Sequence, residues 1–132
     1  MESGSAGGGD AAALAQRQLD AYNAQDAGAF AACYAEDVRV ERLPGGEVVV
    51  EGREALRALY GDLFRREPGR RAELLARMTC GRFAVDHERV TSAPGAEPRF
   101  AVAIYEVEAG LIRRVWFPPT APGASASPSR PA

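Results

Sequence analysis

Apolar residues recur at helical spacing in three segments of the first half of the chain. Between residues 11 and 25 they return every three or four positions in a run without glycine or proline, which predicts an amphipathic helix. We expect this helix to begin after Asp10, because aspartate often caps helix N-termini. Asp26 is a second such residue and predicts a short helix over 27–34. Residues 53–66 show the same spacing and precede a Pro-Gly pair, which predicts a third helix.

Runs of β-forming residues predict strands in the rest of the chain. The segments 38–43 and 47–51 flank a Pro-Gly-Gly turn and predict a hairpin. Four strand-like segments follow the third predicted helix, at residues 71–80, 82–90, 99–108 and 111–117. Because the strands form a run of their own instead of alternating with helices, the fold class that we predict is α+β.

The chain of 132 residues is long enough to bury one hydrophobic core. Residues 1–9 are mostly small, and residues 118–132 mix proline, alanine and serine. Both compositions are typical of disordered tails. We therefore expect a single domain over residues 10–117.

Charge and composition exclude several classes of function. The net charge is −2 with both signs interspersed, so we expect no nucleic-acid partner. No positively charged leader precedes an apolar run, and no apolar run is long enough to cross a bilayer, so we expect a cytoplasmic protein without a membrane partner. The single histidine, His87, stands in no metal-binding spacing, and we expect neither a metal nor a cofactor.

His87 lies between two acidic residues, Asp86 and Glu88. Side chains alternate across a strand, so His87 shares a face with Phe83 and Val85, whereas the two carboxylates point the other way. His87 therefore lies on an apolar face that could line a cavity or form a subunit interface. In a cavity it could act as a general base. The alternative is a structural histidine bonded to the next strand.

Alternation in the predicted strand 99–108 places Glu106 at the end of an apolar row that also contains Phe100 and Ile104. A carboxyl group there could donate a proton to a substrate or pair with an arginine such as Arg77. Ion pairing is the more common use of such a residue.

Three segments of the chain resemble a known superfamily. They are "YNAQDAGAFAACYAEDVRVE", "GREALRALY" and "AVAIYEVEAGLIRRVWF", and they resemble the nuclear transport factor 2-like superfamily, in particular its SnoaL-like and ketosteroid-isomerase-like branches. The resemblance implies a cone of three helices packed on a strongly curved sheet, with a pocket between them and a homodimer formed through the outer face of the sheet. Isomerases, cyclases, dehydratases, hydrolases and binding modules share this fold, so the fold alone does not choose a function.

Ketosteroid isomerases of this superfamily use an Asp base, a Tyr on the first helix and a late Asp. The resemblance places these positions on Arg42, near Gln18 and near residues 99–100, none of which is an acid or a tyrosine. Tyr34 and Tyr60 do match tyrosines that support the oxyanion hole in that family. The resemblance therefore implies a retained pocket without steroid isomerisation.

The epoxide hydrolases of the superfamily activate water with an Asp-Arg-Asp arrangement. Asp86, Arg77 and Glu106 could form a loose version of it. Alternation argues against this version, because it places Asp86 and Glu106 on opposite faces of the sheet.

Three functions remain open. One is a cofactor-free acid–base enzyme (isomerase, cyclase, dehydratase or hydrolase) acting on a small, hydrophobic, oxygenated metabolite. The second is a non-catalytic dimeric module that binds a ligand or a protein, and the third is interaction alone, with the pocket filled by the chain's own side chains. For the enzyme, we expect His87, Glu106 and Arg42 to be catalytic. The expected substrate-binding residues are Gln18, Tyr34, Tyr60, Arg77 and Trp116.

Overall fold

The computed structural model describes the backbone of residues 3–119 and the side chains from Asp10 onward. Its elements are α1 (Ser3–Ala24), α2 (Ala27–Ala31), β1 (Tyr34–Arg42), β2 (Glu47–Glu51), α3 (Arg53–Arg66), β3 (Arg71–Cys80), β4 (Phe83–Thr91), β5 (Arg99–Glu108) and β6 (Leu111–Phe117). All the helices and strands that the sequence predicts are present. Of the tails expected at residues 1–9 and 118–132, residues 1–2 and 120–132 lie outside the described residues, whereas the backbone of residues 3–9 is helical.

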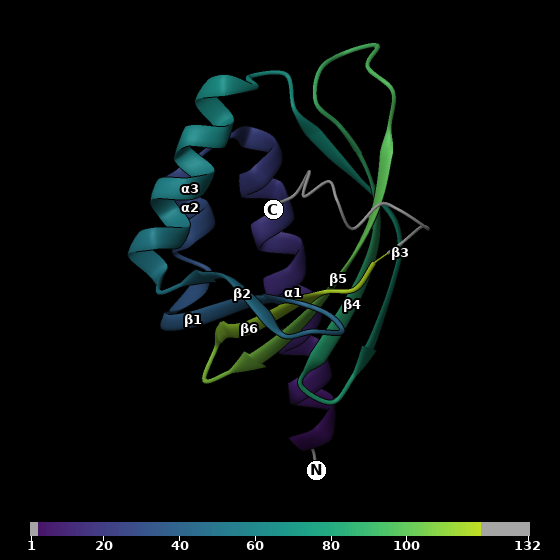
Figure 1. Cartoon of the computed structure of the whole chain (residues 1–132). Helices are drawn as coiled ribbons and strands as arrows, with labels where there is room; N and C mark the ends of the chain where they lie inside the picture. Colours follow the sequence, from purple (N-terminus) through teal and green to yellow (C-terminus); the bar gives the residue numbers. More distant parts are fainter. Residues whose placement is uncertain (1–2, 120–132) are drawn as a thin grey trace.

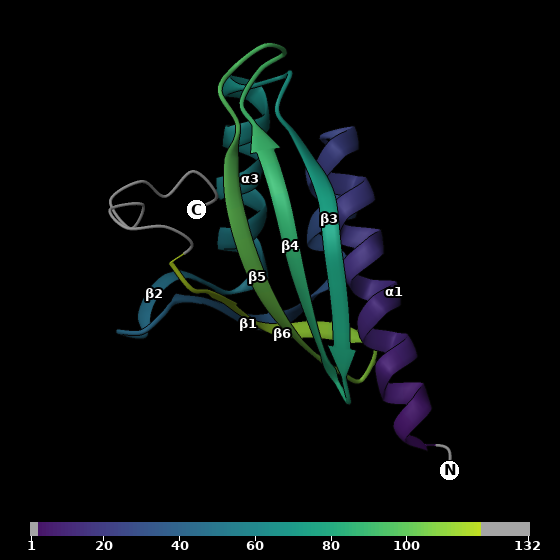
Figure 2. The same ribbon diagram turned by 90° about the vertical axis from the view of Figure 1, so that its right-hand side faces the viewer.

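The six strands form one sheet in the order β2-β1-β6-β5-β4-β3. Neighbouring strands are antiparallel except β1 and β6, which run parallel. Irregular register in β1, β3 and β5 allows these strands to bend. Figures 1 and 2 show β3, β4 and β5 rising steeply from β1, β2 and β6, with the helices on the concave side. This arrangement confirms the predicted α+β cone.

α1 begins earlier than the sequence predicts. Its backbone is helical from Ser3, so Asp10 lies inside the helix and is not its N-cap. A glycine costs a helix only about 1 kcal/mol relative to alanine, and a helix that has nucleated in a packed segment extends one residue at a time. Local composition alone therefore misplaced the start.

α2 is shorter than predicted, and β1 is longer. Asp26 caps α2 as expected, because its Oδ1 accepts a hydrogen bond from the Ala29 N–H at 3.0 Å. The helix ends at Ala31, and Tyr34 opens β1 by pairing with Ile112 of β6. The tyrosine that the sequence assigned to the helix therefore belongs to the sheet.

The core lies between the helices and the concave face of the sheet. Its centre is a cluster of aromatic rings with centroids 4.5 to 6.2 Å apart, contributed by Tyr22, Phe30, Tyr34, Tyr60 and Phe64. All of these side chains are buried. Aromatic contacts of this kind add to the stabilisation from burial, so the cluster holds the three helices together as one layer.

The two faces of the sheet differ in composition. The inner face packs against α1 and carries, along β4 and β5, Ala84, Asp86, Glu88, Val90, Ala101, Ala103, Tyr105 and Val107. The outer face carries Phe83, Val85, His87 and Arg89 on β4, and Phe100, Val102, Ile104 and Glu106 on β5. Alternation predicted both sets correctly. The alanines of the inner face let α1 approach closely, because they occupy little volume above the sheet.

The side chain of Asn23 covers part of the edge of the sheet. Its Oδ1 accepts a hydrogen bond from the Ala72 N–H at 2.8 Å, and its Nδ2 donates to the Ala72 carbonyl at 2.9 Å. The amide thereby replaces a neighbouring strand at this point of β3, which is an edge strand. Polar contacts therefore add to the apolar contacts that bind α1 to the sheet.

Candidate active site

Two carboxylates lie next to each other on the inner face of β4. The side chains of Asp86 and Glu88 are both 0% exposed. Alternate residues of a strand lie about 6.7 Å apart, so the two acids share one environment. Opposite them on β5 stand Ala103 and Ala101, which are too small to cover them. The surroundings of both acids are therefore set by side chains from other elements.

Arg77 of β3 binds one of these acids. Its Nε and Nη2 donate to the two carboxylate oxygens of Asp86 at 2.7 and 3.0 Å, and its Nη1 donates to Oε1 of Gln16 on α1 at 3.0 Å. The hydrogen-bonded carboxylate raises the pKa of the guanidinium above its usual value, and Tyr105 and Glu88 act in the same direction, although partial burial opposes the shift. The bidentate contact fixes Asp86 in orientation.

A second polar group lies between α1 and β1. Gln18 is 1% exposed, its Oε1 accepts a hydrogen bond from the Tyr34 hydroxyl at 3.2 Å, and its Nε2 donates to the Ala15 carbonyl at 3.0 Å. Tyr60 of α3 reaches this region through Phe30, whose ring centroid lies 5.0 Å from that of Tyr34 and 4.5 Å from that of Tyr60. The structure thus brings three of the predicted substrate-binding residues together.

Arg70 is a buried cation just before the start of β3. It is 5% exposed, its Nε donates to the Tyr22 hydroxyl at 2.5 Å, and its Nη1 donates to Glu67 at 2.5 Å. Gln25 of the segment after α1 donates to the backbone carbonyls of both Glu67 and Arg70. These contacts tie the connection between α3 and β3 to the aromatic cluster.

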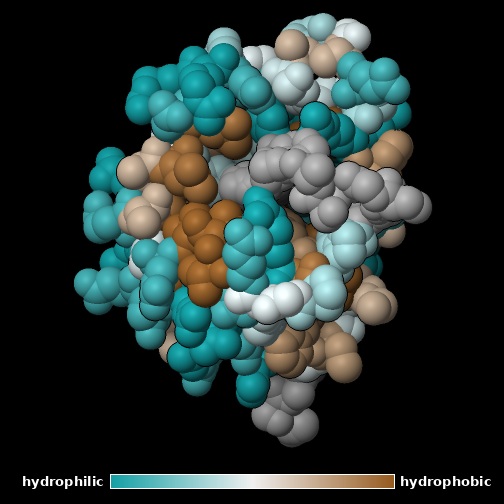
Figure 3. Space-filling model, in the orientation of Figure 1, coloured by the Kyte–Doolittle hydropathy of each residue, from teal (hydrophilic) through white to brown (hydrophobic). Residues whose placement is uncertain are grey.

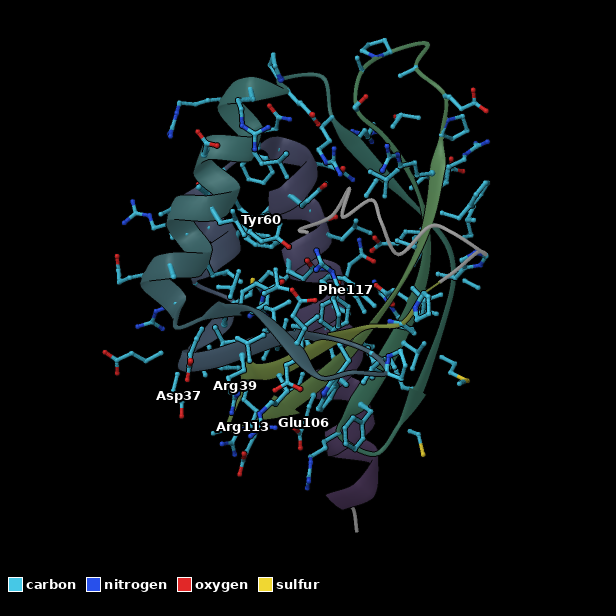
Figure 4. All side chains as sticks on the ribbon, viewed as in Figure 1. Asp37, Arg39, Tyr60, Glu106, Arg113 and Phe117 are labelled. Atoms are coloured by element: carbon cyan, nitrogen blue, oxygen red, sulfur yellow. The ribbon has the colours of Figure 1, made fainter. Side chains whose placement is uncertain are left out.

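Figure 4 shows Tyr60 on α3 and Phe117 at the end of β6 pointing into the space between the helices and the sheet. Tyr60 is buried and Phe117 is half-buried. Figure 3 shows apolar surface along the same flank of α3. A ligand that approached the interior from this side would meet apolar side chains before the polar ones, which suits a hydrophobic molecule.

Three of the predicted site residues, His87, Glu106 and Trp116, lie on the outer face of the sheet. His87 is exposed, with its ring centroid 6.2 Å from that of Phe100. Glu106 accepts a hydrogen bond from Arg82 Nε at 2.8 Å. The structure therefore separates these residues from the buried acids. They lie outside because the apolar face of the strands is the one that α1 leaves uncovered.

Arg42 lies at the end of β1, where its Nη1 donates to Glu47 of β2 at 3.2 Å. In the register of the sheet it stands opposite Phe117. Arg42 is thus at the rim of the interior, and Glu47 is its carboxylate partner.

Asp86 and Glu88 are the interior acids that the sequence analysis did not propose as catalytic. Alternation already places them on one strand face with Ala84 and Val90. Two carboxylates between two apolar residues of a single face indicate buried acids, and this signal could have identified them. The loose Asp-Arg-Asp arrangement is present only in part, because Arg77 binds Asp86 while the second acid of that hypothesis lies on the outer face.

A surface groove of about 730 Å³ lies between α1 and the edge of β3, apart from these residues. Its lining is largely polar and includes Asp20, Asn23 and Arg71, but neither Asp86 nor Glu88. A polar, open groove suits a hydrophobic ligand less well than the interior does. The groove and the buried acids are therefore separate features of the described structure.

In the described part of the chain, no three side chains of histidine, cysteine, aspartate or glutamate lie close enough together to hold a metal ion. No helix found there has the length and apolar character needed to span a membrane.

A family described as "SnoaL-like domain" matches residues 15–115 of the chain. The match runs from the middle of α1 into β6 and includes the buried acids and their partners. Among curated proteins, none matches this chain.

Several solved structures share the fold. An uncharacterized cystatin-fold protein from Novosphingobium aromaticivorans is 31% identical, with a TM-score of 0.72 over 79% of this chain and 93% of that chain. A provisionally named ketosteroid isomerase from Kribbella flavida is 28% identical, with a TM-score of 0.71 over 89% of this chain and 87% of that chain. A provisionally named polyketide cyclase from Sinorhizobium meliloti is 22% identical, with a TM-score of 0.66 over 79% and 92% of the two chains, and shows the fold alone.

Proposed function

Because the chain belongs to the SnoaL-like domain family, we propose that its interior binds a hydrophobic, oxygenated metabolite and catalyses a cofactor-free acid–base reaction on it. Isomerisation, cyclisation, dehydration and hydrolysis belong to this class. Glu88 is the proposed proton carrier, with Asp86 held beside it by Arg77. Tyr34, bonded to Gln18, is the proposed contact for an oxygen atom of the substrate.

The observation that carries this proposal is the burial of two carboxylates on one face of β4. Removing charged or polar groups from water costs free energy even when they are paired, and apolar side chains of similar volume are often as stable or more so. A core that served packing alone would therefore not need two acids here. Neighbouring carboxylates that divide their roles are a frequent arrangement in acid–base sites.

The geometry favours different roles for the two acids. Arg77 binds both oxygens of Asp86, so Asp86 is the fixed, charge-balanced partner. Glu88 takes a proton from a carbon next to a substrate carbonyl and returns it to another carbon of the same substrate. As the C–H bond breaks, its electron pair moves to the carbonyl oxygen, and the enolate oxygen accepts a hydrogen bond from a tyrosine hydroxyl such as that of Tyr34.

The proposed reaction differs from that of true ketosteroid isomerases. The residue that the resemblance aligns with their base is Arg42, which is a cation paired with Glu47 at the rim. The residue aligned near their helix tyrosine is Gln18. The proton carrier proposed for this chain therefore comes from β4 instead of β1.

A second candidate function is a non-catalytic ligand-binding module. The contacts of Gln18 with both Tyr34 and Ala15 favour it, because polar groups that satisfy one another build a rigid cavity wall without doing chemistry. In this case Arg77 and Asp86 brace the fold, and Glu88 contributes only to ligand binding.

We also propose that two copies of the chain pair through the outer face of the sheet. Met78 and Phe100 are 65% and 50% exposed on this face, and large exposed apolar patches mark interaction sites. Half-buried neighbours extend the patch: Phe83, Val85, Val102, Ile104 and Trp116. Ion pairs bound it at each end, so a second copy related by a two-fold axis would meet complementary charges.

A thermal-shift screen of hydrophobic carbonyl compounds tests the interior site, because a ligand of the native state raises the melting temperature. For each compound that binds, NMR in D₂O would measure exchange of carbon-bound hydrogen for deuterium. We expect the wild type to catalyse exchange and Glu88→Gln to lower its rate by about 100-fold or more. Binding should persist in this variant, because glutamine preserves the shape of the side chain.

Glu106→Gln is the matched control, since it removes a glutamate from the outer face without changing the interior. It should leave both binding and exchange unchanged. Binding without exchange in the wild type would identify a non-catalytic module. Equal exchange rates in the wild type and in Glu88→Gln would show that Glu88 is not the proton carrier.

A further inference from the structure

We propose that pairing of two copies through the outer face depends on the protonation of His87, so that the dimer forms at neutral pH and dissociates in mild acid. This inference rests on the homodimer proposed above and is independent of the chemistry of the interior. It gives a role to the single histidine of the chain, which the structure places outside the interior site.

His87 lies in the middle of the outer face. In the register of the sheet it stands between Ala76 of β3 and Val102 of β5. On β3 to β6 the next row toward the β3–β4 turn is apolar and consists of Met78, Val85, Ile104 and Trp116. Glu41 of β1 continues this row beside Trp116. A partner that covered this row would also cover His87, which is exposed in the single chain.

Charged residues bound the apolar rows at both ends. At one end Arg89 lies 2.7 Å from Glu73, and at the other Arg82 lies 2.8 Å from Glu106. Each end therefore carries one arginine and one glutamate. A two-fold rotation that places one end of the first copy against the opposite end of the second can bring a glutamate of one copy next to an arginine of the other. The partner that fits this face is therefore a second copy of the chain.

In the described part of the chain, no carboxylate is placed to pair with His87. Asp86 and Glu88, its neighbours in sequence, lie buried on the other face of the sheet. On the outer face the nearest charged groups are Arg89 and Glu73, and that glutamate is bonded to the arginine. β5 contributes only apolar side chains at this level. Other charged residues of the face stand in other rows: Arg71 opposite Thr91, Glu41 beside Trp116, and Glu106 and Arg114 in the row of Phe83.

These surroundings determine the sign of the pH effect. A neutral imidazole next to the ring of Phe100 can be covered by a partner at little cost, whereas an imidazolium without a counter-ion is costly to remove from water. The dimer is therefore more stable at neutral pH than in mild acid, where an imidazole more readily takes up a proton.

The size of the effect follows from the number of protons taken up. Each dimer covers two His87 side chains, so dissociation in acid binds two protons. The dissociation constant should therefore rise by about 10-fold or more between pH 7.5 and pH 5.5.

Sedimentation equilibrium of the full chain at these two pH values measures the dissociation constant. His87→Gln is neutral at both and should stay dimeric, with a change of less than about threefold. His87→Arg is charged at both and should be monomeric at neutral pH. Circular dichroism verifies that both variants fold, which the exposure of the site favours.

A wild-type chain that is monomeric at pH 7.5 would overturn the homodimer and this inference together, and would leave the interior proposal standing. A dimer whose dissociation constant does not respond to pH would overturn the role of His87 alone. The same conclusion would follow if His87→Gln responded as strongly as the wild type.

Discussion

Replacing Arg77 by methionine removes the cation that faces Asp86 and keeps most of the side-chain volume. The two members of this ion pair are unequally buried: Asp86 is 0% exposed, whereas the side chain of Arg77 is 15% exposed and also contacts Gln16. Loss of the arginine therefore leaves a fully buried carboxylate without its counter-ion. Loss of the carboxylate leaves an arginine that can turn toward water.

Removing one partner of a buried ion pair costs about 3–5 kcal/mol of folding free energy, and Arg77→Met should fall in this range. Asp86→Asn should cost only about 1–2 kcal/mol, because the amide keeps an acceptor for Arg77. The double variant Arg77→Met, Asp86→Leu should be more stable than Arg77→Met alone, because neither buried charge remains.

Urea unfolding followed by the fluorescence of Trp116, the single tryptophan, measures these changes as shifts of the midpoint at constant slope. The expected loss in Arg77→Met corresponds to a melting temperature lower by roughly 15–25 °C.

Equal costs for Arg77→Met and Asp86→Asn would contradict the unequal burial on which this reasoning rests. A loss of folding free energy below about 1 kcal/mol for Arg77→Met would also contradict it, because a buried carboxylate without a counter-ion costs more than that.

Two other contacts give predictions that the same methods can check. Asn23→Leu removes both hydrogen bonds to Ala72 and should lower the free energy of unfolding by about 2–3 kcal/mol in urea titrations. Ala24→Leu, at an exposed neighbouring position, should have little effect. Similar losses in both variants would refute the role of the Asn23 amide. Burial raises the pKa of the Cys33 thiol, although Arg17 opposes the shift. At pH 8 a thiol reagent should therefore label exposed Cys80 rapidly and Cys33 only on unfolding. The contribution of buried Cys33 to stability should decline as the pH rises above about 9. Rapid labelling of both thiols in the folded chain would contradict this burial.

The positions of the helices and strands were predictable because their signals are local. Apolar spacing in 53–66 reproduced α3, and the strand-forming runs after it reproduced β3 to β6 within a residue. Two boundaries differed. The start of α1 depends on extension of a helix that forms further along the chain, and the transfer of Tyr34 from α2 to β1 depends on pairing with β6, a strand far away in sequence.

The candidate site was predictable only in part. Gln18, Tyr34 and Tyr60 were expected to line the interior through a resemblance of family motifs, and the structure places all three there. The choice of His87 over Glu88 as the proton carrier depended on which face of one strand points inward. The strand's own sequence cannot answer that question, because alternation separates the two faces without showing which one another element covers.

By itself, the sequence determined that His87 and its two acidic neighbours lie on opposite faces of β4, because side chains alternate in extended backbone. Only the tertiary structure decided which face is covered. The more apolar face, with Phe83 and Val85, invited the assumption that it points inward. α1 instead packs on the alanine-rich face, where the small side chains let the helix come close. Leucine and tyrosine side chains of α1 fill the space between the helix and the sheet. This packing buries Asp86 and Glu88 and leaves His87 at the surface.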